Sequence, residues 1–273
     1  MDEELKEILA RAKNPAVSCS FGIDSLVILH LCLQIKPDIL VVWNNTLVEY
    51  PDTVRFARQL TKKWNLNLVE TKPKVTFWDI VEKYGFPLAR RGGTKEDNKN
   101  TKKYRKTEYP TDNCCFNLKK APMKRAIREN SIDFAIDGMR RTESWTRRRL
   151  KEKLKFNKKW KTYKFHPILH WTREDVWKYV RSNHLPYNPL YDKKLDGYEV
   201  RTGCWCCTLR ASYGKGLGMA HLHQYYPNLW NYLYLKKGFG RIVFQHRLNP
   251  DFFINEDNLT NWIEERPCLF FQF

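Results

Sequence analysis

The stretch Pro15-Ala16-Val17-Ser18-Cys19-Ser20-Phe21-Gly22-Ile23-Asp24-Ser25 decides the fold of this chain. An apolar run ends in small hydroxyl residues, and an apolar helical pattern over residues 23–33 follows at once. Where a strand of a parallel sheet turns into a helix, the N–H groups of the helix N-terminus can bind an anion. The pattern predicts a phosphate-binding loop made of Ser18, Ser20, Phe21, Gly22, Asp24 and Ser25. The alternative is an ordinary strand–helix turn, and the GK[ST] ending of a Walker loop is absent.

Strand and helix patterns alternate on the C-terminal side of this loop. Residues 38–43 and 66–71 read as strands around a helix over residues 51–64, and residues 133–138 and 165–169 read as further strands. This alternation predicts an α/β fold with a doubly wound, mostly parallel, Rossmann-like sheet of five to six strands. We expect a nucleotide-binding domain over residues 1–200. Residues 201–273 are then an irregular C-terminal extension packed on that domain.

Two groups of cysteines lie far apart in the sequence. Cys114 and Cys115 are adjacent, and Cys204-Trp205-Cys206-Cys207 forms a CxxC with an extra cysteine inside it. Four thiolates can hold one [4Fe–4S] cluster or one zinc ion. Zinc sites usually have a CxxC at both ends, so the pattern favours a cluster bound by Cys114, Cys115, Cys204 and Cys207. Free or buried structural cysteines are the alternative, and we expect Cys206 to be a non-ligand in the turn.

The chain is strongly basic, with 49 Lys and Arg against 30 Asp and Glu among 273 residues, a formal charge of +19. Such an excess attracts anions, which include nucleic acid, a phosphorylated small substrate or an acidic protein, although a merely solvated basic surface is also compatible with it. The lysine-rich residues 92–113 read as a loop. No apolar run is long enough to cross a bilayer, and the acidic residues 1–4 do not resemble an export signal, so we expect a cytoplasmic protein.

The loop resembles the modified P-loop of the adenosine-nucleotide α-hydrolase group, whose pattern is S-G-G-x-D-S. Residues 20–25 read Ser-Phe-Gly-Ile-Asp-Ser, which is similar to the phosphoadenylyl-sulfate and adenylyl-sulfate reductase family. The paired cysteines match the iron–sulfur form of that family. The resemblance extends over about residues 15 to 210, and four further segments agree with the family in order: residues 45–53, 138–147, 171–177 and 185–191.

The resemblance implies a reaction and a set of residue roles. A thiolate attacks the sulfur of (3′-phospho)adenylyl sulfate and expels (phospho)AMP, and a thioredoxin-like thiol then releases sulfite. Arg140, Arg141 and Arg147 are expected to bind phosphate or sulfate oxygens, and Lys119 matches a family lysine near the cluster. The cluster is expected to organise charge rather than to carry electrons. A homo-oligomer is kept open as a form of assembly.

The C-terminus departs from the family pattern. The family nucleophile lies in a Glu-Cys-Gly tail that this chain lacks, and Cys268 is the candidate in the corresponding region. Arg266 favours its thiolate form, whereas a packed terminal cysteine is the other interpretation. The substrate is also left open, because the cluster form implies adenylyl sulfate and the Ser-Phe-Gly-Ile loop favours the 3′-phosphorylated nucleotide.

Two other functions remain compatible with these motifs. Relatives in the superfamily use ATP and an iron–sulfur cluster to insert sulfur into tRNA or DNA, and the basic charge and interleaved aromatic residues suit nucleic acid. Phe21 argues against this function, because it replaces the second glycine of the ATP-hydrolysing loop. A non-catalytic nucleotide-binding module is the third interpretation.

Overall fold

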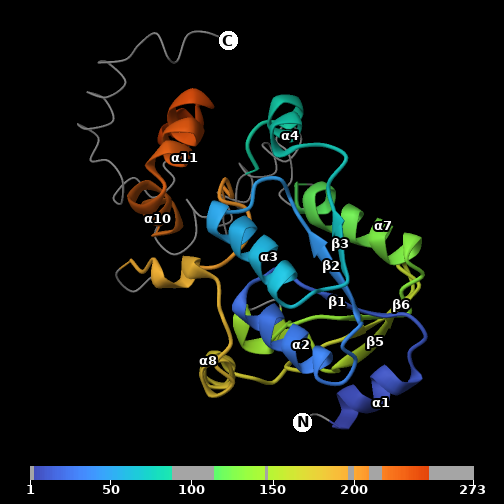
Figure 1. Cartoon of the computed structure of the whole chain (residues 1–273). Coiled ribbons are helices and arrows are strands. Elements are labelled where there is room, and N and C mark those ends of the chain that lie inside the picture. Colours follow the sequence, from blue (N-terminus) through green and yellow to red (C-terminus); the bar gives the residue numbers. More distant parts are fainter. Residues whose placement is uncertain (1–2, 88–113, 145–146, 196–199, 209–216, 246–273) are drawn as a thin grey trace. The chain divides into compact units, whose positions relative to one another are not determined.

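The fold is described from a computed structural model of the chain (Figure 1). The structure describes residues 3–87, 114–144, 147–195, 200–208 and 217–245.

The described residues belong to two compact units that alternate along the chain. We call them the sheet unit and the cysteine unit. The sheet unit comprises Met1–Lys74, Asn117–Leu190 and Arg201–Gly203. The cysteine unit comprises Val75–Phe116, Tyr191–Val200 and Cys204–Phe273.

The sheet unit contains six strands in the order β3-β2-β1-β4-β6-β5. All neighbouring pairs are parallel except β5 and β6, which are antiparallel. The order reverses at β1, which pairs with β2 on one side and β4 on the other, so the carboxyl end of β1 is a topological switch point. This arrangement confirms the predicted doubly wound, mostly parallel sheet. The strands are β1 (Pro15–Ser18), β2 (Leu40–Asn44), β3 (Leu68–Thr71), β4 (Phe134–Ile136), β5 (Leu154–Asn157) and β6 (Thr162–Phe165).

Helices cover both faces of the sheet (Figure 1). Helix α2 is apolar all round and almost entirely buried, whereas α3 and α7 each bury one stripe. Proline in the first turn of α3 and of α7 removes an N–H that has no helical partner there. Thr172 caps α8 through a reciprocal bond pair with Asp175. The helices are α1 (Glu3–Arg11), α2 (Ile23–Leu33), α3 (Pro51–Lys63), α7 (Ala121–Glu129) and α8 (Arg173–Ser182), with short η1 (Phe116–Lys120), η2 (Arg141–Glu143), η3 (Arg147–Arg149) and η4 (Pro189–Asp192).

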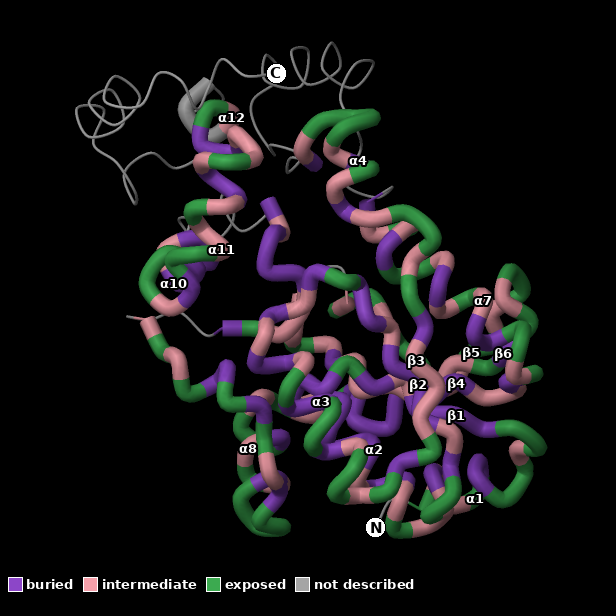
Figure 2. Tube along the Cα trace, turned by 45° about the horizontal axis from the view of Figure 1, so that its top comes forward, coloured by how far each residue is buried: buried purple, intermediate pink, exposed green. Residues whose placement is uncertain are grey.

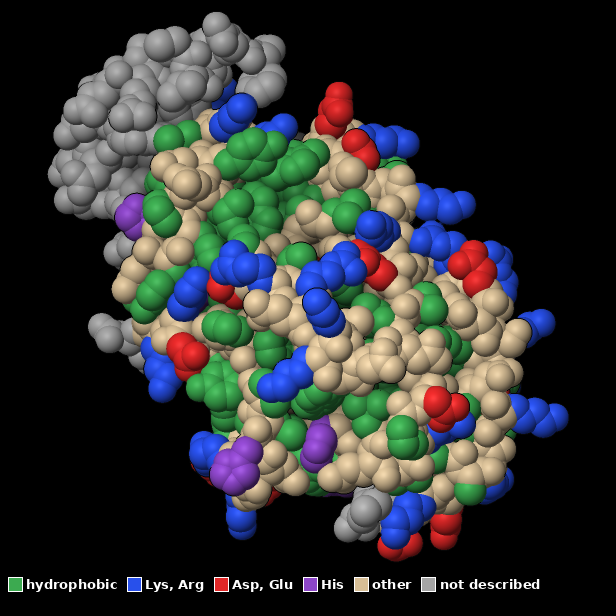
Figure 3. Space-filling model, in the orientation of Figure 1, with side chains coloured by type: hydrophobic (Ala, Val, Ile, Leu, Met, Phe, Trp, Pro, Cys, Tyr) green, Lys and Arg blue, Asp and Glu red, His purple; other side chains and the backbone are tan. Residues whose placement is uncertain are grey.

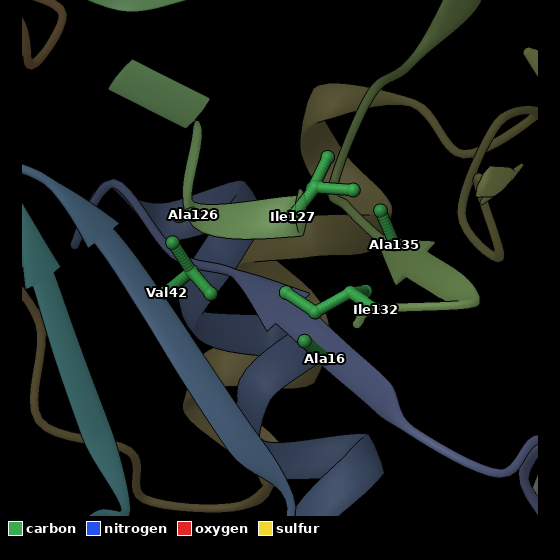
Figure 4. Close-up of a cluster of buried hydrophobic side chains, with 6 residues drawn as sticks. All are labelled: Ala16, Val42, Ala126, Ile127, Ile132 and Ala135. Atoms are coloured by element: carbon green, nitrogen blue, oxygen red, sulfur yellow. The ribbon is translucent and has the colours of Figure 1, made fainter. Parts of the chain in front are cut away.

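Helix α7 is fixed to the sheet by small and branched apolar side chains. Ala16, Val42 and Ala135 of β1, β2 and β4 meet Ala126 and Ile127 of α7, with Ile132 beside them (Figure 4). All six are buried, and small residues on the sheet let the helix approach closely. Burial is deepest in the central strands and decreases toward β5 (Figure 2).

The cysteine unit is built around aromatic side chains. Its helices are α4 (Phe77–Tyr84), α10 (Leu217–Tyr225), α11 (Pro227–Asn231) and α12 (Phe239–Gln245), with η6 (Tyr232–Lys236) between the last two. The ring of Trp78 lies 6.2 Å from that of Trp205 and 5.3 Å from that of Tyr232. Trp205 stands inside the CxxC, so these aromatic contacts hold the cysteine segment in place.

The structure differs from the sequence-based expectations at the edge of the sheet. Strand β5 was not predicted, and β6 spans Thr162–Phe165 rather than the predicted residues 165–169. Pro167 cannot extend β6 as a strand interior, so residues 166–169 form a turn instead. The lysine-rich residues 92–113 lie outside the described residues, and the division at residue 200 stays a prediction. No helix in the described part of the chain is long and apolar enough to cross a membrane.

Candidate functional site

Phe21 anchors the loop after β1 in the hydrophobic core. This residue has a φ of 56°, a left-handed conformation that non-glycine residues rarely adopt. Its fully buried ring lies 5.4 Å from that of Trp43 and 6.4 Å from that of Phe56, both nearly edge-on. The buried Asn188 amide donates to Thr53 Oγ1 at 2.9 Å and to the Phe21 carbonyl at 3.4 Å. The packing of the phenyl ring therefore offsets the backbone strain at the position where related loops have glycine.

Hydroxyl groups close the loop on itself. Ser25 Oγ lies 2.9 Å from the carbonyl oxygen of Gly22, to which it donates, and it accepts the N–H of Ser20 at 3.2 Å. The Ser20 and Ser25 hydroxyl oxygens are 3.2 Å apart. These bonds shape a tight turn at the start of α2, and Gly22 is the N-cap of that helix without a side-chain cap of its own. Burial raises the pKa of the Cys19 thiol to about 11, which disfavours its thiolate form.

The carboxyl end of β4 comes directly against this loop at Gly138. A Cβ atom at this position would lie 2.6 Å from the carbonyl oxygen of Asp24 and 3.0 Å from the nitrogen of Ser25. Real Cβ atoms do not approach that closely, so glycine is required here by contact rather than by its own backbone angles. The loop after β1 and the carboxyl end of β4 therefore lie in direct contact at the switch point.

Asp24 is held by arginines from two different segments. Arg140 Nε donates to Asp24 Oδ1 at 2.6 Å, and its Nη1 donates to Thr142 Oγ1 at 2.9 Å. Arg173, the first residue of α8, reaches Asp24 Oδ2 at 3.5 Å. The Arg140 side chain is only 5% exposed, so its orientation is fixed before any ligand binds.

A second arginine pair meets Glu143. Arg147 donates to Glu143 Oε2, and Arg201 Nη1 lies 3.6 Å from Glu143 Oε1. Burial lowers the pKa of Arg147, and the nearby positive charge of Arg201 lowers it further, whereas Asp137 opposes the shift. Arg201 also donates to the Glu143 backbone carbonyl at 3.4 Å. Arg201 and Arg173 were not predicted from the sequence.

Asp137 joins the ends of β4 and β6. Its Oδ1 lies 2.7 Å from His166 Nδ1 and accepts the backbone N–H of Met139 at 3.1 Å. His166 is buried, with a 4% exposed side chain. Even with Asp137 counted beside Asp24 and Glu143, the four arginines outnumber the three carboxylates. This edge of the sheet therefore keeps a positive charge for an anionic ligand.

Ser18, Arg141 and Lys119, the other predicted ligand-binding residues, each contact a different kind of group. Ser18 Oγ lies 3.8 Å from the sulfur of Met123, and the Arg141 side chain donates to the carbonyl of Arg148 at 3.1 Å. The nearest neighbour of a Cβ built on Gly203 is Lys119 Nζ, at 3.7 Å. Gly203 has a φ of +127°, and Cys204 follows it directly in the chain.

Four cysteines of the cysteine unit interact electrostatically. Burial raises the pKa of the Cys206 thiol well above its usual value, and the nearby charges of Cys204, Cys207 and Cys114 raise it further. Cys206 is fully buried, whereas Cys115 and Cys207 are half-buried. As they stand, no three Cys, His, Asp or Glu side chains among the described residues are close enough to hold a metal ion. The thiol donors nevertheless have the chemistry that iron or zinc requires. Cys268 lies outside the described residues.

Comparison with known proteins identifies the family of this chain. Residues 14–210 match the phosphoadenosine phosphosulfate reductase domain. The chain belongs to that family. A reductase-family relative named adenosine 5′-phosphosulfate reductase, from Geobacillus kaustophilus, is 32% identical over 196 residues, which cover 71% of this chain and 73% of the relative. The Bacillus cereus protein of the same name is 31% identical over 198 residues, covering 72% and 74%.

A third relative and one solved structure complete the comparison. A Methanocaldococcus jannaschii protein of unassigned function is 34% identical over 227 residues. The alignment covers 82% of this chain and 48% of that protein, so the chain spans about half of its length. The phosphoadenylyl-sulfate reductase of Candida auris, solved as a phosphate complex, aligns with a TM-score of 0.54 and 22% identity, covering 75% of this chain and 87% of that one. That structure confirms the fold, and the named relatives confirm the predicted enzyme class, an oxidoreductase acting on a sulfur group.

Proposed function

We propose that this protein is a sulfonucleotide reductase that converts adenylyl sulfate or its 3′-phosphorylated form to sulfite and the corresponding nucleotide. The observation that carries the proposal is the contact of the two strand ends at the switch point. There the loop after β1 touches Gly138, and Asp24 is gripped by Arg140. Family membership supports this reading, and the names of the bacterial relatives specify the reaction class.

The carboxyl ends of β1 and β4 suit a ligand with several negative oxygens. The N-terminus of α2 presents backbone N–H groups, and Ser20, Phe21, Gly22 and Ser25 set their direction. Arg140 bonds Asp24 of this loop and Arg147 interacts electrostatically with the same carboxylate, and guanidinium groups bind phosphate or sulfate in a bidentate way. Because Arg140 is buried and Arg147 is half-buried, water screens their charges less than it screens exposed ones, which strengthens their effect on an anion.

The chemistry has three displacement steps. A cysteine thiolate attacks the sulfate sulfur, the S–O bond to the nucleotide phosphate breaks, and the phosphate leaves with the electron pair. The arginines stabilise the charge that grows on the leaving phosphate oxygen. An external dithiol of the thioredoxin class then attacks the cysteine sulfur of the S-sulfonate, which releases sulfite and leaves a mixed disulfide between the enzyme and the donor. The second thiol of the donor attacks the donor sulfur of this mixed disulfide, so the donor leaves as a disulfide and the enzyme thiolate is restored. We assign the nucleophile to Cys268, a proposal that rests on its sequence position.

We further propose that the cysteine unit holds a [4Fe–4S] cluster, with zinc as the less favoured occupant. Cys114, Cys115, Cys204 and Cys207 are the proposed ligands, and the electrostatic effect of Cys114, Cys204 and Cys207 on the pKa of Cys206 supports the donor set. When bound, such a cluster supplies a fixed local charge. Reduced thiols and a thioredoxin-like donor are features of the cytoplasm, so a cytoplasmic location belongs to this proposal.

The decisive experiment is sulfite release by anaerobically purified protein. Adenylyl sulfate and its 3′-phosphorylated form are supplied separately, with thioredoxin and dithiothreitol, and the kcat/KM values are compared. Cys268→Ser tests the nucleophile, and Cys19→Ser is the matched control, because the buried Cys19 thiol is not expected to react.

The outcomes separate the competing functions. Sulfite from either nucleotide supports the reductase and identifies its substrate. A Cys268→Ser variant with full activity removes that residue from the mechanism. If the protein binds both nucleotides but releases no sulfite while the cluster absorbance is intact, the reductase proposal fails. Release of pyrophosphate from ATP in the presence of RNA then points to sulfur insertion into nucleic acid.

A further inference from the structure

The hairpin of β5 and β6 carries an unusual surface at the edge of the sheet unit. Residues 151–165 contain seven lysines and one acidic residue, Glu152. The hairpin also exposes two large aromatic side chains, Phe156 at 46% and Tyr163 at 40%. Figure 3 shows Lys and Arg side chains projecting from the side of the molecule where Figure 1 places α7, β5 and β6. This surface is separate from the loop and arginines of the candidate site, which lie at the carboxyl ends of β1 and β4.

The aromatic rings form a row across three strands. Tyr163 pairs in register with Phe134 of β4 and with Phe156 of β5, so all three side chains point to the same face of the sheet. The ring centroids of Phe134 and Tyr163 are 4.8 Å apart and nearly parallel, and those of Phe156 and Tyr163 are 4.9 Å apart. Leaving such rings in water is unfavourable by itself, and a row of ring faces is a platform on which planar groups can stack.

Lysines also gather in the turn of this hairpin. The turn between the strands contains Lys158, Lys159 and Lys161, all exposed, and none of them forms an ion pair with any described residue. Asn157 holds the turn, since its backbone carbonyl accepts the N–H of Lys161 at 2.8 Å and its side chain accepts that of Trp160 at 3.1 Å. The hairpin therefore fixes the backbone positions of these lysines, while their side chains extend into water.

The opposite face of the hairpin anchors it. Trp160 packs against the apolar cluster under α7, and Lys164 Nζ lies 4.0 Å from the centre of its ring. Lys155 is the register partner of Lys164 and is exposed. One face thus joins the hairpin to the core, and the other presents aromatic rings.

We propose that the β5–β6 hairpin is a binding surface for single-stranded nucleic acid. Bases stack on Phe156 and Tyr163, while the phosphates follow the lysines of the turn. Stacking on aromatic rings combined with a basic track is the common way in which proteins bind single strands without strong sequence preference. A second copy of this chain is a poorer occupant of the β5 edge, because lysines on an edge strand repel an identical edge.

The test uses the full chain and a fluorescein-labelled oligouridine RNA of about 15 nucleotides, a length that covers typical single-strand sites. Fluorescence anisotropy gives Kd as a function of salt. The aromatic variant is Phe156→Ala with Tyr163→Ala, and the charge variant is Lys158→Glu with Lys159→Glu. The matched control is Lys62→Glu with Lys63→Glu, a second pair of exposed adjacent lysines, at the end of α3. Circular dichroism melting establishes that each variant is folded.

The proposal predicts different effects for the two hairpin variants. The aromatic variant raises Kd about tenfold with little change in the salt slope, because base stacking is lost. The charge variant raises Kd and lowers the slope of log Kd against log salt by about two, one for each phosphate contact removed. The control keeps Kd within about threefold of the wild type.

Several results would overturn the proposal. These are no binding at low salt, an equal loss in the control, or an unchanged salt slope in the charge variant. Competition by polyglutamate as effective as that by unlabelled RNA would show a surface for polyanions in general. A wild-type dimer that dissociates in the aromatic variant would assign the surface to self-association.

Discussion

The two basic regions of the sheet unit differ in how their charges are held. At the carboxyl ends of β1 and β4, Arg140 is buried and meets Asp24 at 2.6 Å, and the partly buried Arg173 and Arg147 also meet carboxylates. In the β5–β6 hairpin, the turn lysines are exposed and have no acidic partner among the described residues. The first arrangement fixes a few charges in a defined geometry, which suits one small anion. The second leaves mobile charges in water, which suits an extended polyanion and depends on salt.

This contrast shows why a net charge of +19 cannot assign a function. A buried arginine that is oriented by hydrogen bonds is ready for its ligand and loses little entropy on binding. An exposed lysine gains affinity mainly by releasing counterions. The predictions that follow test this difference, starting with the largest expected effect.

Replacing Arg140 should produce the largest loss of activity. Arg140→Ala removes a buried cation and leaves Asp24 without its shortest ion pair, so we expect kcat/KM for sulfite release to fall about 10²- to 10³-fold. Arg140→Lys should restore little, because a lysine cannot bond Asp24 and Thr142 together. The control is Arg148→Ala, since Arg148 is exposed in the short η3 and its backbone carbonyl, which accepts from Arg141, is kept in the variant. A full-activity Arg140→Ala variant would separate this arginine from the anion site.

Gly138→Ala should disturb the same edge without changing a charge. The added Cβ would lie 2.6 Å from the Asp24 carbonyl, which belongs to the backbone and cannot rotate away. We expect a loss of about 2 kcal/mol in the free energy of unfolding and weaker nucleotide binding. Urea denaturation and isothermal titration with AMP measure the two effects. Unchanged values for both would show that the strand ends have more room than the structure indicates.

Local patterns explain what could be predicted from the sequence. The loop after β1 was predicted because strand, turn and helix follow one another within residues 15–33, and the paired cysteines were visible from their spacing. Arg173 and Arg201 were missed because their carboxylate partners lie 149 and 58 positions away, and no local pattern links them. Strand β5 was missed for a different reason. Both Lys155 and Phe156 are exposed, so the strand lacks the alternation of burial on which the interpretation relies.

Cys19, on the buried side of the loop, gives a prediction about how the free energy of unfolding depends on pH. Burial raises the pKa of Cys19 to about 11, so the folded protein keeps this proton while an unfolded chain begins to lose it near the ordinary value of 9.0. The stability that Cys19 contributes is therefore intact below about pH 9 and is lost as the pH rises toward 11. Across this window the loss is about 1.4 kcal/mol per pH unit.

A comparison of the Cys19→Ala variant with the wild type tests this prediction. The variant should lose less stability than the wild type between pH 8 and pH 10 in urea denaturation, because the ionisable thiol is absent. Cys32 is present in both proteins and titrates later, since burial raises its pKa to about 12. Parallel pH profiles for the two proteins would show that Cys19 is not buried in solution.

The smallest effects are expected in the hairpin. Phe156→Ala removes a side chain that is 46% exposed, and Lys159→Ala removes one that is exposed and has no ion pair with a described residue. We expect Lys159→Ala to change the free energy of unfolding by less than about 0.5 kcal/mol. Phe156→Ala should lower it by about 1 kcal/mol, because the phenyl ring contacts Tyr163. Neither should change kcat/KM for sulfite release at fixed salt. A tenfold loss of kcat/KM in either variant would mean that the two basic regions act on the same ligand. The difference between fixed and mobile charge would then not correspond to two separate functions.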